Sequence, residues 1–421
     1  MLVTADQQLL KQINRMALVR HLCNEPGLSR AALAESVGLT KSTVSLLVRE
    51  LMDEGWLGES ELVATGELGR RATPLHVDGA RRALLGAELG IEEGRIVATN
   101  LLGEVLDVQA FSYDDVANAA SCIALLGKGL VRMARRMMGD QRRVLGVGIG
   151  LHGGVDDSMG VLHYAPHLGW RAVHVGGLLS ASFARSPLEA LPLFMQNEAN
   201  VAALAEYEFN GQSGADPLIY LSIGHGVGAG VIVSDRLLTG LRGFAGEVGH
   251  AVLQVNGPIC SCGRRGCADA LIGLSALIGD PGSQGAPHGV GAIEDLFQRV
   301  REGDSATMQL VNAAGRNLGV LLNNHWSAFD PACIVVGGAA LRLGDAFTAP
   351  AREVLAGYAA AAGLDAPEVR AAQFGNDAIA VGGAAMVRHY LTRPFSRQLG
   401  FRRDEGSSPP SNAPISAQAY T

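Results

Sequence analysis

Residues 246–267 read GEVGHAVLQVNGPICSCGRRGC, and this short segment contains one histidine and three cysteines. His250, Cys260, Cys262 and Cys267 supply the four nitrogen and sulfur ligands that a structural zinc site takes. Reduced core cysteines are the alternative, which the spacing disfavours. Because four protein ligands leave no open coordination position, we expect Zn²⁺ to fix the loop and to activate no water molecule.

The bulk composition limits the class of protein. A length of 421 residues is too great for one ordinary core and predicts two or three domains. Hydrophobic residues make up 48% of the chain and charged residues 18%, which argues against a disordered protein. Neither a signal peptide nor a long uncharged segment stands out, so we expect a cytoplasmic protein without a membrane partner. The net charge of -7 means that any DNA contact needs a local basic face.

Residues 28–57 show the pattern of two helices joined by a short turn at Gly38. Ser29 and Thr40 are good N-caps, and apolar residues of the second helix recur at the spacing of one buried face. The opposite face is short, polar and basic, which suits the major groove of DNA. A solvated surface helix is the alternative, but the order of these features favours a helix-turn-helix. The residues predicted to contact DNA here are Ser29, Arg30, Thr40, Lys41, Ser42, Thr43, Ser45 and Arg49.

Residues 61–77 predict a β-hairpin wing whose tip carries Arg70 and Arg71. Paired arginines at such a tip suit phosphates or a narrow minor groove. An upstream helix around Met16 would complete a three-helix core. We therefore expect a winged helix-turn-helix DNA-binding domain over residues 1–82.

The remainder of the chain alternates strands and helices. Residues 83–110 read as three successive strands, and a similar β-rich segment recurs at residues 217–240. Because each is followed by alternating helix and strand, we expect a duplicated α/β fold of two lobes. Lobe 1 is expected over about 83–195 together with the C-terminal helix, and lobe 2 over about 196–376. The serine- and proline-rich residues 394–421 predict a disordered tail.

These segments together resemble the ROK family, a group of bacterial sugar repressors and sugar kinases. The most specific match is Glu-x-Gly-His at residues 247–250, followed after nine residues by Cys-x-Cys-Gly-x-x-Gly-Cys. The resemblance implies two actin-like lobes of the hexokinase type over residues 83–393, with a sugar between them. Shorter matches are APHLGW at 165–170, QNEANVAALAEY at 196–207, GHGVGAG at 224–230 and IVVGGAAL at 334–341.

The resemblance covers both enzymes and regulators, so function has to be argued from the sites. Kinases of the family carry a loop of small residues that binds ATP phosphates, whereas Ile91, Glu92 and Glu93 would crowd and repel a triphosphate here. The kinases also place an Asp as general base where this chain has Glu198. A carboxylate misplaced by on the order of 1 Å can cost roughly a hundredfold in rate. These departures favour a regulator without catalytic residues.

The resemblance also implies a set of sugar-binding residues. Carboxylates and amides suit this task because each pairs with adjacent hydroxyls. Asp269 stands where the family usually has Glu, and His167 where kinases often have Asn, so ordinary polar packing is the alternative for both. The predicted sugar-binding residues are Gly153, Gly154, His167, Asn197, Glu198, Glu247, His250 and Asp269.

We therefore expect a sugar-responsive transcriptional regulator, and a repressor, that binds operator DNA and a monosaccharide effector. One alternative is a ROK-type sugar kinase fused to a DNA-binding domain, and another is a DNA-binding scaffold whose sugar cleft is vestigial. Because helix-turn-helix proteins usually read palindromic half-sites, we expect a homodimer or a dimer of dimers.

Overall fold

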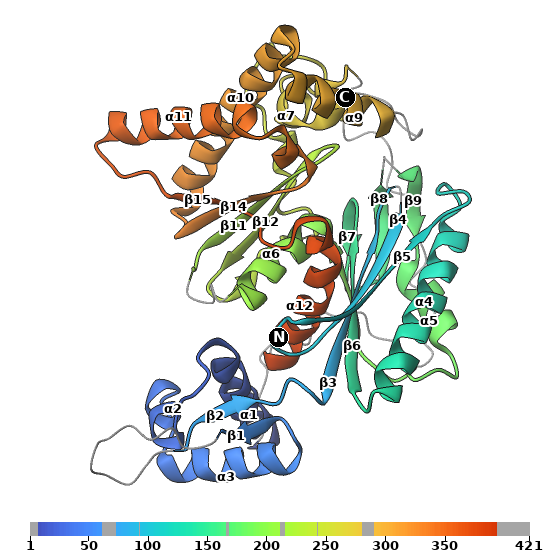
Figure 1. The fold of residues 1–421 in the computed structure, drawn as a ribbon, viewed down its shortest axis with the longest axis vertical. Helices are drawn as coiled ribbons and strands as arrows, with labels where there is room; N and C mark the ends of the chain where they lie inside the picture. The colour runs from blue at the N-terminus through green and yellow to red at the C-terminus, as the bar shows by residue number, and fades with distance from the viewer. Residues whose placement is uncertain are drawn as a thin grey trace.

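The computed structural model of this protein describes residues 7–60, 73–91, 93–165, 168–210, 215–241, 243–279 and 290–393. A small N-terminal head leads into two larger α/β lobes (Figure 1). The predicted fold class, a winged helix-turn-helix followed by a duplicated two-lobed domain, is confirmed, whereas the exact domain limits stay predictions. The predicted positions that lie outside the described residues are Arg70, Arg71, Glu92, His167 and the tail at 394–421.

In its described residues, the head has three helices and a two-stranded antiparallel sheet. Ser29 Oγ accepts a hydrogen bond from the backbone N–H of Ala32 (3.2 Å), and Thr40 Oγ1 accepts one from that of Thr43 (3.2 Å), which confirms both predicted N-caps. The apolar face of α3 packs against α1, where Met16 is buried. The elements are α1 (Gln7–Asn24), α2 (Arg30–Ser36), α3 (Lys41–Asp53), β1 (Leu57–Glu59) and β2 (Leu75–Val77).

Lobe 1 contains a five-stranded sheet in the order β10-β6-β3-β4-β5. Helix α4 covers one face with α5 beside it, and the C-terminal helix α12 covers the other face. A small sheet of β7, β8 and β9 completes the lobe. The elements are β3 (Arg82–Leu89), β4 (Glu93–Thr99), β5 (Val105–Ser112), α4 (Ala119–Gly139), β6 (Arg143–Leu151), β7 (Gly154–Asp156), β8 (Val161–Ala165), β9 (Trp170–Val173), α5 (Val175–Phe183), β10 (Leu193–Asn197) and α12 (Ala378–Thr392).

Lobe 2 repeats this topology with the strand order β13-β12-β11-β14-β15. In each lobe, the strand that comes first in the chain pairs antiparallel with the next strand and parallel with a later one. The two sheets therefore share one pattern of strand pairing, as the predicted duplication requires. Helix α6 covers one face of this sheet, and α10 and α11 cover the other. The strands are β11 (Leu218–Ile223), β12 (Val227–Val233), β13 (Arg236–Leu237), β14 (Cys333–Gly337) and β15 (Glu368–Ala371). The helices are α6 (Glu198–Phe209), α7 (Asp269–Ile272), α8 (Leu274–Leu277), α9 (Val290–Glu302), α10 (Ser305–Phe329) and α11 (Asp345–Ala362), with 3-10 turns η2 (Val248–His250), η3 (Ala339–Leu343) and η4 (Gly375–Asp377).

Helices α6 and α12 pack against each other between the two sheets (Figure 1). They approach closely because Gly382 of α12 has no side chain, and a Cβ there would lie 2.1 Å from the backbone oxygen of Val201 in α6. Since α6 covers the sheet of lobe 2 and α12 that of lobe 1, this contact joins the lobes.

Within the described parts of the chain, no single helix is long and apolar enough to cross a membrane. Helices α2 and α3 meet the criteria of length and composition only as a pair, and a bend of 114° separates them.

A glycine-to-alanine change tests the packing of α12 on lobe 1. A Cβ on Gly148 of β6 would lie 2.0 Å from the backbone oxygen of Gly383, so Gly148→Ala should lower the free energy of unfolding by about 1–3 kcal/mol, the usual cost of overpacking. Gly177→Ala in α5 is the matched control, because nothing lies within 4 Å of its Cβ and Ala favours a helix. Thermal unfolding measures both. A Gly148→Ala protein as stable as wild type would contradict the close approach.

Candidate functional site

The structure brings His250, Cys260, Cys262 and Cys267 together, with one ligand atom of each within 4.8 Å of the others. His250 Nδ1 lies 3.7 Å from Cys260 Sγ, and the Sγ atoms of Cys262 and Cys267 are also 3.7 Å apart. Tetrahedral zinc, with bonds of about 2.0–2.3 Å, separates neighbouring ligand atoms by about 3.5–3.8 Å. The donor set and its spacing therefore fit a closed zinc site.

The loop that carries these ligands is shaped by its own backbone. The N–H of Gly263, at φ 84°, donates to the carbonyl oxygen of Cys260 (2.9 Å), which forms a tight turn between the ligands. Gly266 also has a positive φ of 70°, and a Cβ there would collide with the carbonyl oxygen of Gln254. This backbone geometry favours glycine at both positions. The glycines between the cysteines therefore allow the turns that bring the metal ligands together.

The metal ligands are flanked by two predicted sugar-binding carboxylates. Glu247 precedes the 3-10 turn that ends at His250, and Asp269 begins α7 just after Cys267. Asp269 Oδ1 accepts a hydrogen bond from the backbone N–H of Val227 at the start of β12 (2.6 Å). A metal ion in the cluster would therefore hold both carboxylates in place through the backbone.

Asn197 and Glu198 form a hydrogen-bonded unit where β10 ends and α6 begins. Asn197 Oδ1 caps the helix by accepting from the backbone N–H of Ala199 (2.8 Å). Asn197 Nδ2 donates to Glu198 Oε2 (2.7 Å) and to the carbonyl oxygen of Gly153 (3.0 Å). The backbone N–H of Gly153 also donates to Glu198 Oε2, at 3.3 Å. The local structure therefore fixes the direction of the Glu198 carboxylate.

Glu198, Glu247 and Asp269 influence one another electrostatically. The pKa of Glu247 is raised to about 7, first by burial of its carboxyl group and then by the negative charges of Glu198 and Asp269. The side chain nevertheless remains accessible to solvent. Glu198 begins the helix that joins the lobes, whereas Glu247 and Asp269 belong to lobe 2. A ligand with several hydroxyl groups could donate hydrogen bonds to all three carboxylates.

His152 and Glu88 belong to the same cluster, although neither was predicted as a site residue from the sequence. His152 Nε2 lies 3.3 Å from Glu88 Oε1, and its Nδ1 lies 3.7 Å from Glu198 Oε1. Burial alone lowers the pKa of an imidazole, but the carboxylates of Glu198 and Glu88 outweigh this effect and raise the pKa of His152 to about 10. The signal was a histidine directly after the apolar run of β6.

The two glycines after His152 are explained by packing. Gly153 has φ 115°, and a Cβ there would lie 2.1 Å from the backbone oxygen of Tyr164. A Cβ on Gly154 would lie 2.3 Å from the ring of Phe244. Their expected role in letting a ligand approach the backbone stays a prediction.

The predicted DNA-contacting residues fall into two groups. Lys41, Ser42 and Arg49 of α3 are exposed, as the polar face requires, and Ser45 and Thr43 are half-buried. Leu46, which was not predicted from the sequence, lies on this face with an exposed fraction of 53%. An exposed apolar group there is suited to contact with a thymine methyl group. In the second group, Ser29 and Thr40 cap helices, and Arg30 pairs with Glu59 at 2.8 Å. The hydroxyl groups of Ser42 and Thr43 also have a partner, because they lie 3.0 and 2.8 Å from the hydroxyl oxygen of Thr40.

The turn between β3 and β4 contains Ile91, which packs against the core of lobe 1. The backbone N–H of Gly90 donates to the carbonyl oxygen of Glu93 (3.2 Å) and closes the turn. Glu93 pairs with Arg95 at 2.6 Å, and the same guanidinium pairs with Asp377 at 2.6 Å. The turn thus presents an apolar and an acidic residue, and its neighbouring arginine is bound by two carboxylates.

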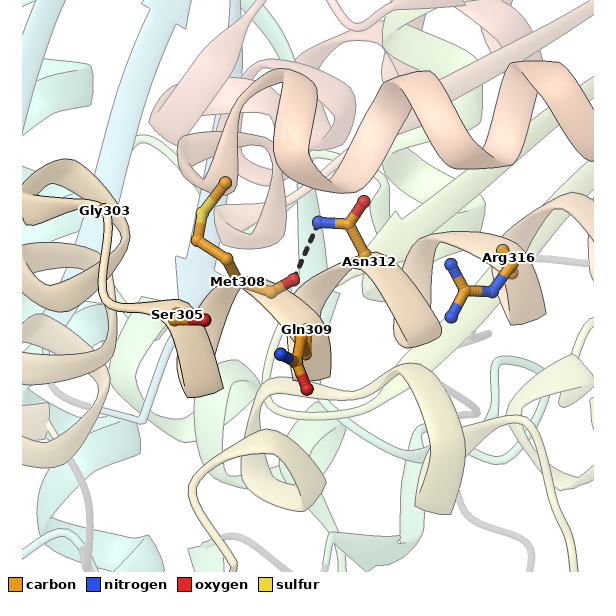
Figure 2. Close-up of a pocket in the computed structure, with 6 residues that line it drawn as sticks. All are labelled: Gly303, Ser305, Met308, Gln309, Asn312 and Arg316. Atoms are coloured by element: carbon orange, nitrogen blue, oxygen red, sulfur yellow. Dashed lines mark hydrogen bonds between the residues drawn. The ribbon is translucent and has the colours of Figure 1, made fainter.

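A depression of about 720 Å³ lies along α10 and the turn before it (Figure 2). Asn312 Nδ2 donates to the carbonyl oxygen of Met308 (2.7 Å), so this amide is satisfied within the helix. The depression includes none of the carboxylates or metal ligands described above. Its lining residues are Gly303, Ser305, Met308, Gln309, Asn312 and Arg316.

The stability that His152 contributes should depend on pH. Its pKa is about 10 in the folded protein and about 6.5 when unfolded, so its ion pairs stabilise fully below pH 6.5 and are lost as the pH rises through 10. His152→Gln should therefore lower the free energy of unfolding by about 3 kcal/mol at pH 6, because the carboxylates lose their partner, and by much less above pH 10. Melting temperatures at pH 6, 8 and 10.5 test this. The exposed His163, changed to Gln, is the control; a His152 effect that stays constant or grows with pH would exclude the ion pairs.

Removing one ligand should release the metal. Cys262→Ser replaces a thiolate by a weak ligand, and we expect zinc content to fall from about one ion per chain to a small fraction of that. The melting temperature should fall as well, because the ion stabilises the folded state by mass action. Ser261→Ala is the control in the same loop. Elemental analysis and thermal unfolding measure both effects, and full zinc content in Cys262→Ser would rule out the proposed ligand set.

Known proteins match both parts of the chain. Residues 84–390 match the ROK family, and residues 12–57 match a winged helix-turn-helix DNA-binding family. The xylose repressor of Caldicellulosiruptor bescii is 28% identical over 393 residues, which cover 91% of this chain and 97% of that protein. A glucokinase of Halalkalibacterium halodurans is 28% identical over 324 residues, which cover 73% of this chain and 95% of that enzyme.

A solved structure has a similar fold across both parts. It is a ROK family transcriptional regulator described as a homologue of the E. coli MLC protein, and its TM-score is 0.73 at 23% sequence identity. The likeness covers 93% of this chain and 99% of that one. Because the family match spans well over half of the sequence and includes the metal cluster and the carboxylates, this chain belongs to the ROK family.

Proposed function

We propose that this protein is a sugar-responsive transcriptional repressor. The observation that carries the proposal is the carboxylate cluster of Glu198, Glu247 and Asp269, present in one chain with a head that exposes the polar face of α3. The repressor of C. bescii aligns over both parts, which makes D-xylose the first effector to test.

The sugar hydroxyls would bind Asn197, Glu198, Glu247 and Asp269, as the residues implied by the family resemblance. His152 keeps Glu198 oriented by pairing with it at 3.7 Å. His250 faces the cysteines through Nδ1, so its role is to hold the metal and the adjacent carboxylate. Zn²⁺ has a structural role in this proposal, because its four protein ligands leave no position for a substrate.

Operator DNA would bind the head. Lys41, Ser42, Ser45 and Arg49 would enter the major groove from α3, and the wing residues Arg70 and Arg71 would meet phosphates or the minor groove. We propose a homodimer or a dimer of dimers in the cytoplasm, because two heads are needed to read a palindromic operator.

The second candidate is a ROK-type sugar kinase with a DNA-binding head, which the matching glucokinase favours. Two observations support a non-enzyme instead. Glu198 is bound by Asn197, by the N–H of Gly153 and by His152, so its carboxylate is already engaged by groups of the protein. The β3–β4 turn is occupied by Ile91 and ends at Glu93, where a triphosphate would meet a carboxylate.

The proposal is tested with a DNA duplex selected from random sequence by the wild-type protein. Fluorescence anisotropy should show that D-xylose, D-glucose or N-acetyl-D-glucosamine weakens operator binding by at least about fivefold. Glu247→Gln should abolish this response and leave DNA binding unchanged, because Glu247 belongs to lobe 2 and the DNA-facing residues belong to α3 of the head. Calorimetry with the same sugars tests the vestigial-cleft alternative. Sugar-dependent ADP formation at roughly 1–100 per second would show a kinase and reject the proposal.

A further inference from the structure

The head shares a hydrophobic core with the lobes, and it also touches them through a charged contact that the sugar site does not use. Asp235, in the turn between β12 and β13, pairs with Arg20 of helix α1. Its carboxylate also accepts hydrogen bonds from Arg393 Nη2 (2.6 Å) and Nε (3.0 Å), directly after α12. Tyr207 of α6 donates to it at 2.9 Å. One carboxylate therefore connects α1 of the head with β12, α6 and α12, and we call this contact the joint.

Lobe 2 holds the Asp235 carboxylate in a fixed place. Ser234 and Asp235 both have positive φ angles, 52° and 62°, which suit a tight hairpin turn. Their backbone N–H groups both donate to the carboxylate of Asp216, each at 2.7 Å. The backbone of the turn thus has little freedom to move independently of β12.

Two elements run from the sugar site to the joint. Strand β12 begins at Val227, whose N–H binds Asp269, and its other end leads into the turn that carries Asp235. Helix α6 begins at Glu198 and includes Tyr207 near its far end. Each element spans on the order of 20 Å. Helix α6 is hydrogen-bonded within itself and β12 is hydrogen-bonded to β11 and β13, so a shift at one end of either element moves the other end.

A buried charge cluster keeps α6 and α12 together at this end. Glu208 of α6 lies within 2.8 Å of nitrogens of Arg388, His389 and Arg393. Burial would raise the pKa of Glu208, but Arg393 and Arg388 hold it well below its ordinary value, so the group is ionised at neutral pH. Separating such a buried pair is costly, so α6 and the end of α12 move as one body.

We propose that Asp235 is a positioning residue that sets the orientation of the DNA-binding head through Arg20. Movement of α6 and β12 when a sugar binds is carried to the Asp235 carboxylate and from there to α1. This inference rests on the proposed function and adds the residue pair through which the two sites communicate. The matched control is Arg15, on the same helix, whose partners Glu50 and Glu54 lie within the head.

The first experiment compares Arg20→Ala, Arg15→Ala and Arg20→Lys in the full chain. Calorimetry with D-xylose should give a sugar Kd within about twofold of wild type for all three, because none contacts the sugar site. Anisotropy on the selected duplex should show that the sugar-induced change in operator Kd falls at least about fivefold in Arg20→Ala. Arg15→Ala should retain the full response, and Arg20→Lys should recover part of it. A full sugar response in Arg20→Ala would overturn the inference.

A second measurement needs neither sugar nor DNA. Cys23 lies three residues after Arg20 on α1 and also faces the lobes. Its Sγ donates to the carbonyl oxygen of Leu101 (3.8 Å), and Arg388 donates to the same oxygen (3.0 Å). Labelling of Cys23 by N-ethylmaleimide, read by peptide mass spectrometry, should accelerate at least about threefold in Arg20→Ala and stay unchanged in Arg15→Ala.

The two measurements separate the possible failures. If the wild-type protein binds the duplex and D-xylose, D-glucose and N-acetyl-D-glucosamine all leave its affinity unchanged, the proposed sugar response is wrong. The labelling of Cys23 then tests by itself whether Asp235 positions the head. Unchanged labelling of Cys23 in a folded Arg20→Ala protein would overturn the positioning role. Melting temperatures show whether Arg20→Ala folds. If it does not, Arg20→Lys and the double variant Arg20→Lys/Asp235→Asn take its place. The sugar-induced change in operator Kd should then be reduced in the single variant and reduced further in the double variant.

Discussion

The close packing of α6 against α12 is the constraint on which both lobes depend. Gly382 allows the helices to approach until no side chain fits between them, and Glu208 then binds Arg388 and Arg393 across the contact. A buried charge that loses its partner costs about 3–5 kcal/mol, so the helices cannot slide past each other freely. Because α6 begins at Glu198, the packing of α6 against α12 also determines the position of the Glu198 carboxylate relative to lobe 1.

The cluster of Glu198, Glu247 and Asp269 places like charges near one another, which destabilises the folded state unless other interactions offset the repulsion. Burial and the neighbouring carboxylates raise the pKa of Glu247 to about 7, which is a sign of this cost. His152 offsets part of it by pairing with Glu198 and Glu88, and the N–H of Val227 binds Asp269. A metal held by three thiolates and an imidazole would fix the backbone on which two of the carboxylates stand. Such a site suits neutral hydroxyl donors and disfavours anions.

Local sequence signals predicted the parts of this molecule that are determined locally. The caps at Ser29 and Thr40, the buried face of α3 and the Cys-x-Cys spacing each depend on residues a few positions apart, where helix and turn geometry are regular. The family resemblance supplied Asn197, Glu198, Glu247 and Asp269 as a group. The pairs His152–Glu88 and Asp235–Arg393 join residues 64 and 158 positions apart, and a single sequence does not reveal which distant charges meet.

A regulator needs a ligand that favours one arrangement of its lobes over another, since equal affinity for two states shifts nothing. Under the proposed function, hydroxyl groups would bind Glu198 on α6 and, at the same time, Glu247 and Asp269 of lobe 2. Because Glu198 is also bound by Gly153 and His152 of lobe 1, these contacts are complete only in one relative position of the two lobes. The paired state of Glu198, held by Asn197, Gly153 and His152, suits this task because a fixed acceptor loses little conformational freedom when a ligand binds. Sugar binding would then favour one position of α6. The far end of α6 carries Tyr207, which binds Asp235, and Asp235 pairs with Arg20 of the head.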